Sequence, residues 1–160
     1  MAAGAGPRRR STPPVDYELL AELHYQVRRF LRVREEAARG VGLEPQQYVL
    51  LLQVKGVERH RAATVGVLAE RLQIRHHGTV QLVDRLAERG MVRRRRAELD
   101  RRGVVVEVTP RGEAILKKLA LYSLTELRTA GPALASALTR LIGRTEARRS
   151  RGPRATARSR

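Results

Sequence analysis

Apolar residues recur at three- and four-residue steps along most of this chain, and the pattern changes to alternation at one place. The helical spacing is clearest in residues 15–39, where the apolar positions would form one stripe along a long helix. The alternation lies in residues 104–109, where Val104, Val106 and Val108 would share one face of a strand. The sequence therefore predicts a mainly α-helical protein with one small β-hairpin.

Glycine, proline and capping residues divide the helical pattern into six expected helices. These are residues 15–39, 45–55, 64–72, 76–89, 110–130 and 134–142. Gly90 would end the fourth helix, and Gly131 with Pro132 would separate the last two. Two strands, residues 91–95 and 104–109, are expected on either side of a polar hairpin tip.

The two ends of the chain differ from the body in composition. Residues 1–14 are small, basic and proline-containing, and residues 144–160 are rich in arginine, so both are expected to be disordered. Residues 15–143 would form the folded part. Its first helix and residues 110–143 would form a dimerisation region, and residues 45–109 a DNA-binding part.

The charge of the chain points to a polyanionic partner. The formal net charge is +17, from 33 basic and 16 acidic residues, and this imbalance is typical of nucleic-acid-binding proteins. Nearly all the basic residues are arginines, which also suits a GC-rich genome and a merely basic surface. That bias alone would not explain the shortage of acidic residues.

Several classes of site are missing from the sequence. The chain has no cysteine, which excludes disulfides, zinc–thiolate sites and thiol redox switches. No catalytic triad, paired catalytic carboxylates or glycine-rich phosphate loop occurs at a recognisable spacing, so we expect neither an enzyme nor a cofactor. No apolar run could span a membrane and no secretory signal is present, so we expect a cytoplasmic protein associated with the nucleoid.

The order of the expected elements is that of a winged helix-turn-helix. Residues 76–89 would form the helix that enters the major groove, and the following hairpin would form a wing beside it. The apolar stripe of this helix would be Val80, Val83, Leu86 and Ala87. The outward face would present His77, Gly78, Gln81 and Arg85.

Four runs of residues resemble the MarR (multiple antibiotic resistance regulator) family. They are TVGVLAERL at 64–72, LVDRLAERGMVRR at 82–94, DRR at 100–102 and VTPRG at 108–112. The resemblance spans residues 15–142 and implies a two-fold dimer joined by its first and last helices. It also implies binding to a palindromic promoter element on double-stranded DNA, commonly as a repressor, and often release by a small aromatic or phenolic effector.

The resemblance also assigns roles to individual residues. Arg101 and Arg102 would be the minor-groove arginines of the wing, and Asp100 would hold the wing by pairing with a nearby arginine. The start of the recognition helix would face bases or phosphates through Arg75, His76, His77, Thr79 and Gln81. Many relatives have serine near position 75, where this chain has Arg75, and many helix-turn-helix turns have glycine where this chain has Gln73.

Some of these residues have a second interpretation. His76 and His77 are adjacent and so poorly placed to share a metal ion; they are DNA contacts or solvated cap residues. Tyr25, Tyr48 and Tyr122 would line an effector pocket or, as isolated aromatics in helical stripes, pack in the core. The main rival function is a non-specific architectural DNA-binding protein, and the second is an enzyme or metal sensor.

Overall fold

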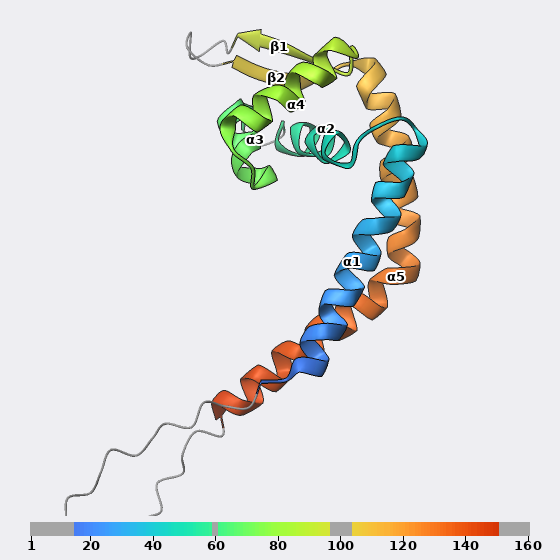
Figure 1. The fold of residues 1–160 in the computed structure, drawn as a ribbon, viewed down its shortest axis with the longest axis vertical. Helices are drawn as coiled ribbons and strands as arrows, with labels where there is room; N and C mark the ends of the chain where they lie inside the picture. The colour runs from blue at the N-terminus through green and yellow to red at the C-terminus, as the bar shows by residue number, and fades with distance from the viewer. Residues whose placement is uncertain (1–14, 59–60, 97–103, 151–160) are drawn as a thin grey trace, which may run out of the picture.

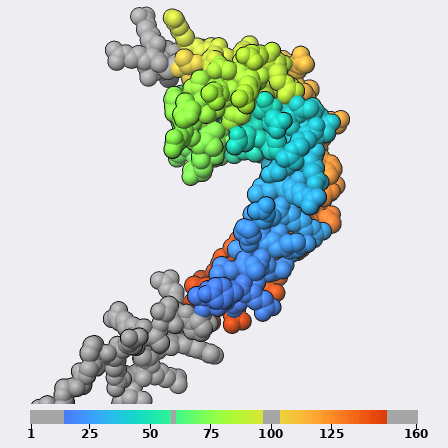
Figure 2. All heavy atoms as spheres, in the orientation of Figure 1, coloured from blue at the N-terminus to red at the C-terminus, as the bar shows by residue number. Residues whose placement is uncertain are grey.

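The computed structural model describes residues 15–58, 61–96 and 104–150. Two long helices, α1 (Tyr17–Gly40) and α5 (Pro110–Ser150), lie side by side and form an arm (Figure 1). The lobe at one end of the arm contains α2 (Pro45–Val57), α3 (Val65–Leu72), α4 (His76–Glu88), β1 (Val92–Arg96) and β2 (Val104–Val108). Together the lobe and the arm give the molecule a hooked outline (Figure 2). The prediction of a mainly helical winged helix-turn-helix is confirmed.

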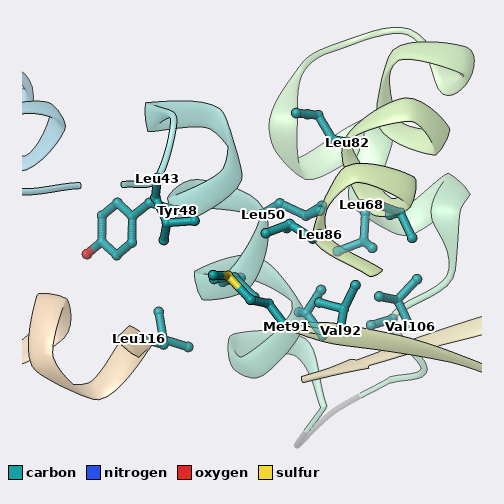
Figure 3. Close-up of a cluster of buried hydrophobic side chains, with 14 of the residues drawn as sticks. Leu43, Tyr48, Leu50, Leu68, Leu82, Leu86, Met91, Val92, Val106 and Leu116 are labelled. Carbon is teal, nitrogen blue, oxygen red and sulfur yellow. The ribbon is translucent and has the colours of Figure 1, made fainter. Parts of the chain in front are cut away.

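The core of the lobe surrounds α2. Leu50, Leu51 and Val54 of this helix have no exposed surface, and they form the centre of its wide buried face. Leu86 of α4, Val106 of β2 and their neighbours gather over it (Figure 3). α2 begins as expected at Pro45, and Glu44 and Gln47 form a capping box that the sequence analysis missed.

The turn between α3 and α4 follows from its end residues. Thr64 begins α3 by accepting a hydrogen bond from the Val67 amide at 3.3 Å, as its predicted capping role requires. Gln73 ends the helix with φ of 54°, in the left-handed region where glycine is usual. The chain thus builds the helix-turn-helix with glutamine in the position that favours glycine.

The hairpin is antiparallel and is joined to the start of α3. Val92 pairs with Val108 and Arg96 with Val104. On its other edge, β2 makes a bridge between Val105 and Thr64. The wing is therefore fixed to the start of α3 by backbone hydrogen bonding, including the bond from the Val106 amide to the Ala63 carbonyl at 2.9 Å.

The last two expected helices are one continuous helix in the structure. α5 runs from Pro110 to Ser150 and contains Pro132 in its interior, so the predicted break at Gly131 and Pro132 is wrong. An interior proline removes one helical hydrogen bond. α5 nevertheless packs against α1 along the arm, and buried residues lie on both sides of the proline, Leu119 before it and Ala137 after it. α5 also extends to Ser150, beyond the predicted end of the folded part.

The two helices of the arm are also tied at their far end. Asp16 caps α1 by accepting a hydrogen bond from the Leu19 amide at 3.2 Å. The second oxygen of the same carboxylate lies 2.9 Å from Nε of Arg144 on α5. One side chain therefore begins α1 and anchors it to the end of α5.

Lys55 links the lobe to the start of α5. Its Nζ lies 3.2 Å from a Glu113 oxygen and 3.3 Å from a Glu58 oxygen. The hydrogen bond to Glu113, followed by that to Glu58, raises the pKa of Lys55 above its ordinary value. The Lys55 ammonium group is exposed to solvent, so these ion pairs add little to stability.

Among the described residues, no helix is both long and apolar enough to cross a bilayer.

The chain enters α5 through a very close backbone contact. Thr109 acts as the expected cap, since its Oγ1 accepts from the Gly112 amide at 3.2 Å and donates to the Gly90 carbonyl at 2.6 Å. A Cβ atom added at Gly112 would lie 2.1 Å from the carbonyl oxygen of Met91. Only glycine fits at this position.

We predict that Gly112→Ala lowers the free energy of unfolding by about 1–3 kcal/mol, the usual cost of overpacking a core. The matched control is Gly143→Ala on the same helix, where an added Cβ meets nothing within 4 Å. That change should raise stability by about 0.5–1 kcal/mol, because alanine favours helix. Urea unfolding at one protein concentration measures both. Equal effects of the two substitutions would contradict the close contact.

Candidate nucleic-acid interface

The outward face of α4 carries polar and charged side chains that reach solvent. His77, Gln81 and Arg85 are exposed and recur at four-residue steps, so they share one side of the helix. His76 and the preceding Arg75 are exposed at its start. The structure therefore brings five of the six predicted helix contacts to one surface.

The start of α4 suits an anionic partner. Arg75 occupies the N-cap position and no side chain caps the helix there. The first amides of a helix point outward and carry partial positive charge. A phosphate group is a natural partner for such a helix start, beside the side chains of Arg75, His76 and His77.

Thr79 lies on the opposite side of α4 and contradicts the prediction for this residue. Its side chain has no exposed surface, and its hydroxyl donates to the Arg75 carbonyl at 3.3 Å. The buried stripe of α4 is Thr79, Leu82, Val83 and Leu86. Val80, which the sequence analysis assigned to the core, is only half-buried, so the buried face is rotated from the expected one.

The wing presents a row of arginines whose partners are now visible. Glu107 of β2 lies 2.9 Å from Arg93 and 3.0 Å from Arg95. Arg94, whose place in the strand alternates with these two, forms an ion pair with Asp84 of α4. The predicted tip residues Asp100, Arg101 and Arg102 lie outside the described residues.

The three tyrosines that were predicted to line a pocket lie in different environments. Tyr48 is buried, and its hydroxyl lies 3.1 Å from Oγ of Ser123 and accepts from Arg34 at 3.3 Å. Tyr25 is 58% exposed and Tyr122 is 44% exposed. Core packing is therefore the better interpretation of Tyr48, which joins α1, α2 and α5 where the lobe meets the arm.

A cavity of about 450 Å³ nevertheless lies between α1 and the lobe. Its lining includes Arg34 and Tyr48 on one side and Leu72, Ile74 and Leu82 on the other. The Arg34 guanidinium lies 5.1 Å from the Phe30 ring centroid and 5.5 Å from that of Tyr48. Its buried Nε has no hydrogen-bond partner among the described residues.

Sequence reasoning missed two residues of these surfaces, Arg34 and Asp84. Arg34 lies in a run of charged residues on α1 that looks like a solvated face. Asp84 had a usable signal, because it follows Gln81 by three residues and so belongs to the outward face. Among the described residues, no group of three or more histidine, aspartate or glutamate side chains could hold a metal ion.

Comparison with known proteins finds that part of this chain is similar to one family. The sequence profile of the MarR family matches residues 41–103, from the loop before α2 to the wing. The chain is 36% identical over 75 residues to the uncharacterised HTH-type transcriptional regulator YfiV of Bacillus subtilis strain 168. That match covers 47% of this chain and 44% of the relative, less than half of its length.

Solved structures extend the likeness to the arm. A MarR transcription factor from Planctomyces limnophilus is 29% identical, with a TM-score of 0.58 over 84% of this chain and 98% of its own. A mutant of Escherichia coli MarR complexed with operator DNA has a TM-score of 0.62 at 21% identity, over 80% and 93%. Bordetella bronchiseptica BpsR, whose DNA binding is regulated by 6-hydroxynicotinic acid, has 0.58 at 18%, over 81% and 98%.

Two substitutions in α4 should separate readout of DNA from packing. We predict that Gln81→Ala leaves the melting temperature unchanged and relaxes base preference at one base pair of each half-site, since an exposed amide can pair with an adenine edge. Thr79→Val should lower stability by about 0.5–1.5 kcal/mol through the lost hydrogen bond and leave base preference unchanged. Thermal unfolding and binding to single-base-pair variants of one DNA site measure both effects. Altered base preference in Thr79→Val would contradict the buried position.

Proposed function

We propose that this chain is a member of the MarR family of winged helix-turn-helix regulators, whose profile matches residues 41–103, and that it acts as a dimeric repressor that occupies a palindromic promoter element. The observation that carries the proposal is the exposed face of α4, with Arg75, His77, Gln81 and Arg85, directly beside the β1–β2 wing. This pairing suits simultaneous contact with a major groove and the adjacent minor groove. Its place of action would then be the nucleoid.

The dimer is supported by apolar surface on the arm. Tyr17 of α1 is 75% exposed, and Leu124 and Ile142 of α5 are 58% and 48% exposed. Further exposed apolar residues lie on the same helices: Leu20, Val27, Leu31, Leu121, Leu127 and Leu138. A surface of this kind marks an association site, and a second copy would bury it with two-fold symmetry.

The residues of the proposed interface divide between positioning and readout. Arg75, His76 and His77 would contact phosphates at the start of α4, and Gln81 and Arg85 would reach base edges. Arg101 and Arg102 would enter the minor groove from the wing, with Asp100 holding their loop. We propose no catalytic role for any of these groups, because each has an assignment in DNA binding.

The alternative is an architectural protein that binds DNA through charge alone. The net charge of +17 would suit it. Such a protein would show steep salt dependence and little preference for any sequence. An exposed glutamine at the centre of the α4 face favours the sequence-specific function, since its amide is of little use to a partner recognised only by phosphates.

Selection of bound sites from a random DNA library by the full chain, at one salt concentration, tests this function. We expect a two-fold element whose half-sites lie about 10 base pairs apart. Arg102→Ala should cost about 1–3 kcal/mol of binding free energy and weaken discrimination mainly at the flanks. Equal binding of all sequences would favour the architectural alternative. Unchanged affinity of Arg102→Ala would exclude the wing from the interface.

We further propose that a small aromatic acid bound in the cavity at Arg34 releases the DNA. The unpartnered Nε of Arg34 favours an anionic group, and the apolar wall of Leu72 and Ile74 favours a ring. Because the cavity lies between α1 and the lobe, a ligand there would favour a spacing of the two lobes that fits DNA poorly.

A panel of small aromatic carboxylates that begins with 6-hydroxynicotinic acid tests the effector. We expect at least one member to raise the melting temperature and lower affinity for the selected DNA site, and Arg34→Gln to remove both effects. Arg29→Gln, exposed on the same helix and outside this cavity, is the control and should respond like the unmodified protein. A response that survives in Arg34→Gln would place the ligand elsewhere.

A further inference from the structure

A carboxylate lies on the side of α4 that the proposed function turns toward DNA. Asp84 follows Gln81 by three residues and His77 by seven, so all three share the outward face. Its side chain is 44% exposed. In the proposed complex, a negative charge at this position would be repelled by the DNA phosphates unless a cation neutralised it.

The partner of Asp84 is Arg94 of the wing. The Arg94 guanidinium donates to Oδ1 of Asp84, and Arg94 is 37% exposed. Since Arg94 belongs to β1, this ion pair joins the recognition helix to the wing by their side chains. It thereby holds the Arg94 side chain against α4.

Acidic residues restrain three of the four arginines of β1. Glu107 holds Arg93 and Arg95 across the strand pair, and Asp84 holds Arg94. An arginine without such a restraint is available to bind any DNA phosphate within reach. Phosphate contacts of this kind carry no sequence information. Phosphate contacts make up essentially all of the affinity for random DNA. Each arginine released from its carboxylate would therefore strengthen binding to random DNA by one phosphate contact.

We propose that Asp84 is a specificity-determining residue, which restrains Arg94 and so suppresses binding to DNA that lacks the target sequence. This inference rests on the proposed sequence-specific function. On the target site, base contacts already fix the positions of α4 and the wing, and Arg94 in its ion pair fits that arrangement. On random DNA no base contact fixes the protein, and Arg94 would bind any phosphate within reach if Asp84 did not hold it. Asp84 thus increases specificity by weakening binding to random DNA rather than by strengthening binding to the target site.

Glu88 provides a matched control for the charge itself. It is exposed on the same face of α4, four residues after Asp84. Among the described residues it has no ion-pair partner. Glu88→Gln therefore removes the same charge from the same face without releasing an arginine.

The test compares binding of the selected target site and of random duplex DNA by the full chain over a range of salt concentrations. For Asp84→Asn we expect affinity for random DNA to rise about fivefold at physiological salt, with a salt dependence steeper by about 0.9, the effect of one added phosphate contact. Affinity for the target site should change less than twofold. Glu88→Gln should change the ratio of the two affinities less than twofold.

A double variant, Asp84→Asn with Arg94→Ala, completes the design. It should return the affinity for random DNA to the level of Arg94→Ala alone, because the effect of Asp84 acts through Arg94. Equal effects of Asp84→Asn and Glu88→Gln, or an unchanged affinity ratio in Asp84→Asn, would overturn the inference and leave the proposed function intact. Failure of the unmodified protein to prefer any sequence would overturn both.

Discussion

The wide buried face of α2 is the constraint on which the rest of the structure depends. This helix contacts α1, α3, α4, β2 and α5, and Leu50, Leu51 and Val54 leave no surface to solvent. Protein cores are packed too densely for such a helix to shift alone. The position of α4 relative to the wing, and of the whole lobe relative to the arm, is therefore set by what packs on α2.

Charge at the proposed DNA surface is organised in pairs rather than spread as a uniform positive field. The chain carries twice as many basic as acidic residues, yet carboxylates are placed beside the arginines of β1. Exposed ion pairs of this kind add little to stability. Their main effect is on orientation, because they determine which arginine side chains a phosphate can reach and in which direction those side chains point.

Much of the fold could be predicted from the sequence, since periodicity and capping residues act locally. Most of the outward face of α4 was also predicted, but Thr79 and Leu82 are buried and Val80, expected in the core, is only half-buried. A threonine hydroxyl can form a hydrogen bond to the backbone of its own helix. A threonine in a helix can therefore be buried even though its side chain is polar. The continuation of α5 through Pro132 could not be predicted, because it involves packing against α1, which is distant in sequence. The pairing of Asp84 with Arg94 could not be predicted because it depends on how β1 is oriented relative to α4, which periodicity does not indicate.

The continuity of α5 has a mechanical consequence. At 1.5 Å per residue, its 41 residues form a rod about 60 Å long. One end is seated against the carbonyl of Met91 beside the wing, and the other reaches the tip of the arm (Figure 1). A tilt of about 10° at the seated end would carry the far end through about 10 Å, since displacement grows with the length of the rod. A small change in the orientation of the lobe would therefore produce a much larger displacement at the tip of the arm.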